Sequence, residues 1–348
     1  MAWYIEAGPQ ENVVLSSRVR IARNLQELPF PNRLNPEQAA AVEKQIEGCF
    51  LSLYPSQSRA DWNIVRLAEL EDMQRLALAE KHLLSKRMLE PGCNKKLIIS
   101  KDESQSMMIL EEDHLRIQAM SAGLDLEQAY RLASDLTCKL EAKLPLAWDD
   151  QFGFLTACPT NTGTGLRASV MLFLPGLIRT DQLRYLTDIL GKAGYAVRGS
   201  NGEGSKVEGY RVQISNQMTL GLAESEILQD LNHLVKDLIQ KEQEARRQLQ
   251  RADSTGLEDQ VWRARGILEN ARRISFEEAC GLLAELRLGI GLGIIEQLPL
   301  TALNRIDANI GPASLQQISG KPLSAAERDQ VRARLIREEL LGAERHSK

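Results

Sequence analysis

The sequence predicts an α+β domain followed by a smaller all-helical region, and three observations lead to this fold class. Strand-like runs occur only up to about residue 220, helical patterns lie between these runs, and helical patterns alone continue after Gly221. No internal repeat or low-complexity linker interrupts this arrangement. We therefore expect two units, residues 1–222 and residues 223–348.

Apolar runs with strand periodicity mark the sheet of the first unit. They lie at 13–23, 95–100, 106–111, 152–157, 167–174 and 210–216. The segment KDES (101–104), between the second and third runs, has the composition of a hairpin turn. A hairpin joins antiparallel neighbours, so we expect a mainly antiparallel sheet rather than a series of βαβ units.

Two segments of the first unit begin with helix-start signals. Asn35 has the side chain of an N-cap, and Pro36 follows at the first helical position. Farther along, Asp125 and Gln128 form a variant of the capping box ahead of an apolar stripe that reaches Leu140. Both segments are expected to be helices that flank the sheet.

Helical patterns account for the second unit. They cover 223–252, 257–272, 275–290, a stretch around 298–308, and 324–343. The first carries Ile227, Leu231 and Leu238 at helical spacing before it becomes strongly charged. Such a stripe is typical of a core-facing helix or of a helix that packs on a partner helix.

Composition limits the class of protein and its compartment. The 348 residues are 43% hydrophobic and 26% charged with a net charge of -4, which excludes disordered and fibrous classes and argues against a basic nucleic-acid binder. The five cysteines contain no C-x-x-C, which fits neither a disulfide framework nor a zinc site. No leader or membrane-length apolar run is visible. We expect a protein of the reducing cytoplasm.

The run VVLSSRVRIARNL (13–25) concentrates positive charge near the start of the chain. With the strand period of two, Val13, Leu15, Val19 and Ile21 share one face, and the other face carries Ser16, Arg18 and Arg20. Guanidinium groups match phosphate oxygens in charge and in bidentate geometry. The alternative is a solvated strand edge with surface ion pairs.

The segment LEEDHLRIQ (110–118) is unusually acidic at its start. If it were helical, Glu112 and Arg116 would share a face as an ordinary i,i+4 ion pair. Alternatively, the cluster of Glu111, Glu112 and Asp113 beside His114 could recognise a cationic substrate.

Two glycine-rich segments are candidate ligand loops. TACPTNTGTGLRASVMLFL (156–174) resembles a phosphate-binding loop in composition but lacks the P-loop pattern, and its Cys158 is either a buried small side chain or a reactive thiol. RGSNGEGSKVEG (198–209) carries Glu203 between glycines and reads either as an active-site flap or as a mobile hairpin loop.

Five segments, taken in this order, resemble the phosphagen (guanidino) kinase family, most closely its bacterial protein arginine kinases. They are SSRVRIAR (16–23), EKHLLS (80–85), EEDHLRIQ (111–118), CPTNTGTGLRASVM (158–171) and RGSNGEG (198–204). The resemblance covers residues 13 to 220 and implies a phosphagen-kinase-like catalytic domain with a mainly antiparallel sheet flanked by helices. It also implies transfer of the γ-phosphoryl group of ATP to arginine side chains of proteins, in protein quality control and the stress response.

Creatine and arginine kinases carry a small helical domain before the first arginine motif. Here that motif starts at Ser16, and a helical segment follows the catalytic part instead. This departure favours a guanidinium on a protein over a free small molecule. Two alternatives remain open, namely a kinase for free arginine or another small guanidino compound, and a phosphoarginine-binding adaptor with vestigial catalysis.

The resemblance also implies roles for individual residues. The ATP-binding residues would be Ser16, Ser17, Arg18, Val19, Arg20, His82, Arg116, Arg167, Ala168, Ser169, Val170, Met171, Arg198, Gly199, Ser200, Asn201 and Gly202. Arg23 would be structural. Mg²⁺ would be held mainly by nucleotide oxygens, so no metal site made by the protein itself is expected.

An arginine side chain is protonated at any ordinary pH, so its guanidinium must lose a proton as it attacks phosphorus. The resemblance implies that Glu112 and Glu203 grip this guanidinium and that one of them accepts the proton, with Cys158 beside it as a residue that tunes the site. The family usually has an aromatic residue where Asn201 stands, which leaves target preference open.

Near the C-terminus, RDQVRA (328–333) matches the motif that protein arginine kinases use as an allosteric phosphoarginine pocket. The implied pocket residues are Arg328, Asp329, Arg332 and Ala333, and the two arginines are one helical turn apart. The alternative is an exposed charged helix. The resemblance further implies a homodimer, a zinc-containing activator, a Clp-type unfoldase or protease, and a stress-response repressor among the substrates, with no direct contact to nucleic acid or membrane.

Overall fold

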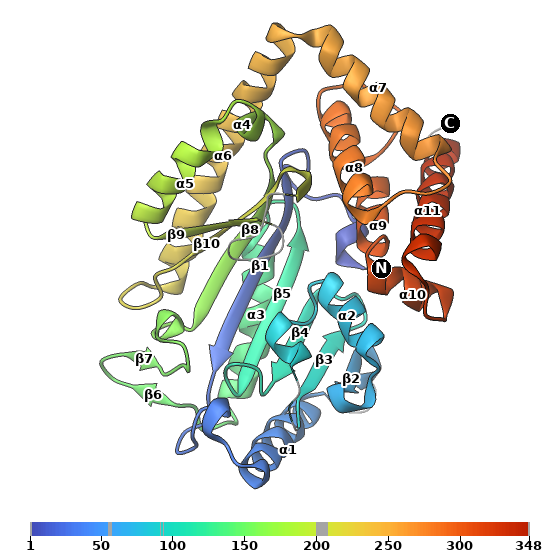
Figure 1. The fold of residues 1–348 in the computed structure, drawn as a ribbon. Helices are drawn as coiled ribbons and strands as arrows, with labels where there is room; N and C mark the ends of the chain where they lie inside the picture. Colours follow the sequence, from blue (N-terminus) through green and yellow to red (C-terminus); the bar gives the residue numbers. More distant parts are fainter. Residues whose placement is uncertain (1, 55–57, 91, 93, 200–207, 347–348) are drawn as a thin grey trace.

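An eight-stranded antiparallel sheet forms the centre of the computed structural model (Figure 1). The structure describes the chain except residues 1, 55–57, 91, 93, 200–207 and 347–348. The strand order is β2-β3-β4-β5-β1-β8-β10-β9. The strands are β1 Val14–Arg23, β2 Trp62–Arg66, β3 Lys96–Ser100, β4 Gln105–Ile109, β5 Leu115–Ala122, β8 Leu166–Phe173, β9 Tyr195–Gly199 and β10 Arg211–Asn216.

Most of the predicted strands are confirmed, and so is the hairpin between β3 and β4. The run 152–157 is the exception. It contributes only β7 (Gly153–Phe154), which pairs with β6 (Trp148–Asp149) in a separate two-stranded ladder. Strands β2, β5, β6 and β9 were not predicted, because β2, β6 and β9 are short and β5 follows an acidic segment whose charge spacing also allows a helix. The predicted antiparallel sheet is therefore correct, although its strand list was incomplete.

Strand β1 lies in the interior of the sheet, between β5 and β8, and this position excludes a solvated strand edge. Val19 and Ile21 are buried in the main core, as the alternation predicts. Leu15 was wrongly placed on that face. A register shift between Val14 and Ser16 puts Val14 in the main core, and Leu15 packs instead against a second apolar cluster that contains Phe173.

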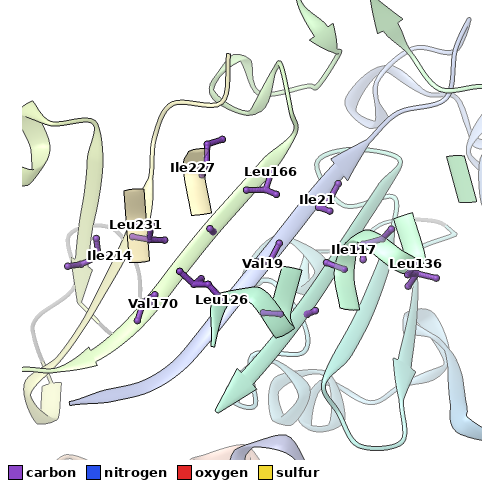
Figure 2. Packing of buried hydrophobic residues seen from close by; sticks show 14 of the residues in the cluster. Val19, Ile21, Ile117, Leu126, Leu136, Leu166, Val170, Ile214, Ile227 and Leu231 are labelled. Atoms are coloured by element: carbon purple, nitrogen blue, oxygen red, sulfur yellow. The ribbon is translucent and has the colours of Figure 1, made fainter. Parts of the chain in front are cut away.

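Two long helices, α3 (Leu126–Glu141) and α6 (Glu224–Ala252), line the apolar face of the sheet. Figure 2 shows Leu126 and Leu136 of α3, and Ile227 and Leu231 of α6, close to the apolar side chains of the strands. The stripe predicted on 223–252 is thus a core stripe of the sheet. By packing, α6 belongs with the strands, and the change of core comes between α6 and α7 rather than at 222/223.

The remaining helices of the first part lie around the sheet, and α7 to α11 form the helical region (Figure 1). Their bounds are α1 Pro36–Leu53, α2 Asp72–Glu80, α4 Pro175–Arg179, α5 Gln182–Lys192, α7 Ser254–Asn270, α8 Phe276–Gly291, α9 Leu300–Asn309, α10 Pro312–Ser319 and α11 Ala325–His346. The prediction missed α10. Its start could have been recognised from Gly311 at the N-cap and Pro312 at the first helical position.

The N-cap predicted at Asn35 is confirmed, and it forms part of a full capping box that was not predicted. The Asn35 side chain accepts a hydrogen bond from Gln38 N at 2.8 Å, and Gln38 Oε1 accepts one from Asn35 N at 3.1 Å. At α3 only half of the predicted box forms. Asp125 accepts from Gln128 N, but Asp125 N donates to the buried hydroxyl of Ser17 instead.

We expect Asn35→Ala to lower the free energy of unfolding by about 1 kcal/mol, because a helix N-cap without a side-chain acceptor leaves a backbone N–H unpaired. Urea unfolding of the full chain measures the change. Asn35→Asp keeps the acceptor and serves as the matched control, with little loss expected. Equal losses in both variants would contradict the assigned cap.

Candidate active site

The face of the sheet opposite the main core carries the predicted arginines. Arg18 and Arg20 alternate with the buried Val19 and Ile21 on β1. Arg167 on β8 is the direct cross-strand neighbour of Arg20, so the two side chains lie on the same face. On the other side of β1, Arg116 of β5 pairs in register with Ala22. Strand pairing therefore brings together charges that are far apart in the chain, as with Arg20 and Arg167, which are 147 positions apart.

Neutral side chains orient the guanidinium groups of Arg18 and Arg167. Arg18 donates to Ser169 Oγ at 3.2 Å and to Gln213 Oε1 at 2.9 Å. Arg167 Nη2 donates to Ser215 Oγ at 3.3 Å. These three hydrogen bonds are to neutral side chains and hold the two guanidinium groups in place.

The five predicted arginines form one electrostatic cluster. Burial and the charges of Arg116, Arg167 and Arg198 lower the pKa of Arg18 to about 10. Burial and the charges of Arg18, Arg116 and Arg167 likewise lower the pKa of Arg20. Within the described residues, Arg20 Nε is buried without a hydrogen-bond partner. Five guanidinium groups gathered on one face of a sheet, with Glu111 paired to Arg116, fit a polyanion such as a triphosphate.

Some predicted nucleotide residues do not reach this face. Val19, Ala168 and Val170 are buried in the main core behind it. The Ser17 hydroxyl is fully buried as well, where it donates to Gly123 O and accepts from Asp125 N. The structure thus separates these residues from the arginines, because alternate residues of a strand point to opposite faces.

Other predicted residues do lie with the arginines. Ser169 accepts from Arg18, and Met171 pairs in register with Ser16 and with Gln213. Gly199 is buried at the end of β9, where it pairs with Val212. Four predicted residues, Ser200, Asn201, Gly202 and Glu203, lie outside the described residues.

His82 lies in the turn that follows α2 and has a positive φ of 59°. Its carbonyl accepts a hydrogen bond of 2.7 Å from Gln118 Nε2, and Gln118 pairs in register with Arg20. Desolvation and the charges of Arg18 and Arg211 lower the pKa of His82. His82 is an exposed residue beside this positively charged face.

The acidic segment 110–114 is a turn between β4 and β5, and the helical i,i+4 pair between Glu112 and Arg116 is wrong. Arg116 instead pairs with Glu111 at 2.6 Å. Burial opposes ionisation of Glu111, but the charge of Arg116 and hydrogen bonds from Ser85 and Glu112 N–H keep its pKa below the usual value. Glu112 pairs with the guanidinium of Arg87 at 3.1 Å and stays partly exposed.

The other two members of that acidic cluster have structural partners. Asp113 is buried and accepts from Asn24 Nδ2 and Ala157 N, each at 2.7 Å. His114 Nδ1 accepts from Leu25 N at 3.0 Å, and Nε2 lies 2.9 Å from Pro29 O. Of the four residues, only Glu112 has a carboxylate available to a cationic ligand.

The glycines of the 156–174 segment serve the fold. A Cβ on Gly163 would lie 2.4 Å from Thr219 O, and one on Gly165 would lie 2.6 Å from Ala22 O. Cys158 is half-buried, with Sγ 3.0 Å from Thr160 Oγ1. These glycines let backbone segments approach each other, and the residues of this segment that reach the arginine face include Arg167 and Ser169 on β8.

Arg23, expected to be structural, is buried at the end of β1. It bonds Glu141 at 2.7 Å and the carbonyls of Ala22 and Thr164, each at 2.9 Å, and its guanidinium lies over the ring of Phe154. Because these bonds occupy its guanidinium, Arg23 has a structural role and is not counted in the charge cluster.

The RDQVRA segment lies on α11, but its two arginines do not converge on one site. Arg332 is 1% exposed and donates to Ile310 O, Ile274 O and Asp329 Oδ1. Arg328 donates to Leu323 O at 3.0 Å. The alternative of an exposed charged helix is wrong, because Arg332 and Ala333 are buried. A separate hollow of about 360 Å³ is lined by Arg272, Arg273, Gln330, Val331, Arg334 and Arg337.

Three side chains of β10 belong to the site and were missed. Arg211, Gln213 and Ser215 alternate with buried residues along the predicted strand 210–216, and this alternation could have identified them. The Asp307 partner of Arg211, at 2.6 Å, comes from α9 and had no sequence signal.

Among the residues that the structure describes, no three His, Cys, Asp or Glu side chains gather as a metal-ligand set. The same described part contains no helix with the length and apolarity needed to cross a membrane. The donors that do gather are guanidinium groups, which fit nucleotide phosphates rather than a cation.

Comparisons with known proteins agree with this geometry. A family described as ATP:guanido phosphotransferase, C-terminal catalytic domain, matches residues 41–245, and the Protein-arginine kinase McsB C-terminal domain matches 254–348. A protein-arginine kinase of Moorella thermoacetica is 44% identical over 340 residues, covering 98% of this chain and 97% of that protein. One of Bacillus subtilis is 40% identical over 342 residues, covering 97% and 93%.

Solved structures show the same fold. The structure of a lombricine kinase matches with a TM-score of 0.59 and 25% identity, covering 70% of this chain and 71% of that one. A duplicated taurocyamine kinase from Schistosoma mansoni matches with a TM-score of 0.61 and 26% identity, covering 74% of this chain and 38% of that one. With a catalytic-domain match over most of the sheet and relatives alike over nearly their whole length, the chain belongs to the protein-arginine kinases of the ATP:guanido phosphotransferase family.

Proposed function

We propose that this chain transfers the γ-phosphoryl group of ATP to arginine side chains of proteins, with the arginine face of the sheet as the phosphate site. The observation that carries the proposal is the juxtaposition of two neighbouring carboxylates with different partners. Glu111 holds Arg116 of the charge cluster, and Glu112 holds the guanidinium of Arg87. A site for phosphate thus adjoins a carboxylate already bonded to a guanidinium.

In this proposal Arg18, Arg20, Arg116, Arg167 and Arg198 bind the triphosphate. Their positive charge offsets the charge that develops as the phosphoryl group moves, and it is in place before the reaction begins. Mg²⁺, which supplies further neutralisation of the phosphates, would be held mainly through the nucleotide, because the adjoining strand faces offer guanidinium groups rather than carboxylates.

In this proposal the acceptor guanidinium binds to Glu112, where the guanidinium of Arg87 is bound in this structure. A carboxylate can align an incoming guanidinium by paired hydrogen bonds and accept the proton that it loses. We assign the second carboxylate to Glu203 from the sequence resemblance alone. Substitution of Arg87 is a direct way to ask whether it competes with the acceptor for Glu112.

Mass spectrometry under conditions that preserve acid-labile P–N bonds tests the function. The purified chain is incubated with Mg-ATP and an unfolded arginine-rich protein, and separately with free arginine. Phosphoarginine on the protein alone is the expected result. Transfer to free arginine would indicate a small-molecule guanidino kinase, and no transfer despite ATP binding would indicate the phosphoarginine adaptor or a missing activator.

The finer biological setting is part of the proposal. We propose that the protein acts in the cytoplasm as a homodimer, with a zinc-containing activator and a Clp-type unfoldase or protease as partners, in the stress response and in protein degradation. Its targets would include a stress-response repressor. Support for these partners comes from the resemblance of the five sequence segments and from RDQVRA (328–333).

We expect Cys158→Ser to keep transfer within about tenfold of the unmodified chain and to remove inhibition by thiol alkylation. The thiol is half-buried beside Thr160, and the proposed chemistry needs no covalent step on sulfur. Rates before and after treatment with iodoacetamide measure both effects. Cys138→Ser, at an exposed thiol on α3, is the matched control and should leave the inhibition in place. Persistent inhibition in Cys158→Ser would contradict the prediction.

A further inference from the structure

The helical region is attached to the sheet domain by a carboxylate at the end of α2. Glu80 Oε1 accepts from Ala313 N at 2.8 Å, and Oε2 accepts from Ser314 N at 2.8 Å and from Ser314 Oγ at 2.7 Å. These donors are the free N–H groups of the first turn of α10, where a negative charge is also favoured by the helix dipole. A Cβ on Gly311 would lie 2.2 Å from Glu80 Oε2, so a larger residue there would displace this carboxylate.

The same carboxylate lies two residues before His82. The chain reverses after Glu80, and the N–H groups of Leu83 and Leu84 both bond Leu78 O, which closes α2. The His82 carbonyl in this turn accepts from Gln118, the cross-strand neighbour of Arg20. The turn is therefore bonded to α10 on one side and to the arginine face on the other.

On its far side the junction is held by Arg332 of the RDQVRA segment. Arg332 Nε donates to Ile310 O at 3.0 Å, and Ile310 directly precedes the Gly311 N-cap of α10. A continuous set of contacts thus runs from a buried arginine on α11, through the start of α10, to the turn that carries His82. Figure 1 shows α10 beside α2 where the helical region meets the sheet domain.

We propose that Glu80 is a positioning residue through which the helical region sets nucleotide affinity. It pins the first turn of α10 and so fixes the turn of residues 81–84, which holds His82 against the arginine face. The inference rests on the proposed function, because it takes His82 to lie at the nucleotide. If Glu80 only stabilised the fold by capping α10, its substitution would leave the nucleotide affinity of the folded chain unchanged.

Calorimetric titration of the full chain with a non-hydrolysable Mg-ATP analogue, together with steady-state kinetics, tests this role. In Glu80→Gln the amide N–H₂ opposes the N–H donors of α10, so we expect the Kd and the KM for ATP to rise about tenfold with kcat unchanged. Ser314→Ala removes one donor and should shift Kd in the same direction by less. Asp72→Asn, on the same helix but bonded only to Arg75, is the matched control and should bind like the unmodified chain.

Three results would overturn the inference: a folded Glu80→Gln chain with unchanged Kd, a loss of kcat without a rise in KM, or an equal loss in Asp72→Asn. Hydrogen exchange at residues 81–85 gives a readout that needs no nucleotide. Faster exchange there in Glu80→Gln supports the junction, and unchanged exchange overturns it, even if the unmodified chain binds no ATP. Failure of the proposed function is thereby distinguished from failure of the coupling.

Discussion

Glu112→Gln is expected to lower the rate of phosphoryl transfer by 10²–10⁴-fold, on the order of the contribution of a positioned general base. The glutamine keeps the size of the side chain but neither accepts a proton nor carries the charge that holds a guanidinium. Nucleotide binding should be largely retained, because Glu112 pairs with Arg87, which is not one of the five phosphate arginines. Single-turnover transfer and ATP-analogue titration measure the two quantities separately.

Glu111→Gln, one residue earlier, is the matched control. It should weaken nucleotide binding more than it lowers the rate of transfer. The buried Glu111 orients Arg116 at 2.6 Å and has a lowered pKa, so its loss should mainly raise the KM for ATP. A Glu112→Gln chain that transfers at the normal rate would overturn the assigned role. Identical kinetic losses in the two variants would show that the segment acts only as a folded unit.

Arg20→Met should separate stability from function. Transfer is expected to fall by about 10²–10³-fold, the usual cost of losing one preorganised group that offsets developing charge. At the same time the nucleotide-free chain should become more stable by roughly 0.5–2 kcal/mol, because the fold holds Arg20 desolvated among like charges. Urea unfolding without nucleotide and single-turnover kinetics give the two numbers.

The control for these two opposite effects, on transfer and on stability, is an arginine outside the cluster. Arg263→Met, in an exposed pair with Asp259 on α7, should change neither transfer nor stability appreciably. If Arg20→Met lowers both stability and transfer, Arg20 is a structural residue of the sheet. If transfer survives, the phosphate site lies elsewhere on the molecule.

Local patterns predicted the parts of the fold that depend on nearest neighbours in the chain. Alternation along residues 13–23 identified the faces of β1, and the cap at Asn35 identified the start of α1. Short elements such as β2, β9 and α10 were missed because a few residues carry too little periodicity, whereas β5 was missed because the charges before it also allow a helix. The same limit explains why the register shift at Val14 was not foreseen, since a bulge depends on the partner strand.

The candidate site was predicted in composition and only partly in geometry. The five arginines and Glu112 were predicted as a set that could handle phosphate and guanidinium, and strand pairing brings the arginines to one face of the sheet. The partner of Arg116 was misassigned, because a turn at 110–114 cannot be told from a helix start by its charges. Glu80 carried no sequence signal of its own, since its partners lie 233 and 234 positions away.

By itself the sequence determined the class of chemistry, because guanidinium and carboxylate side chains at fixed strand positions face one way whatever surrounds them. Only the tertiary structure decided which groups are free to act. Arg332 and Ser17 have hydrogen-bond donors that could bind a ligand, but in the core these donors bond backbone carbonyls. Among the described residues, Arg20 Nε has no hydrogen-bond partner. Burial and hydrogen bonding with distant segments set that availability, and these contacts exist only once the sheet and the helical region have come together.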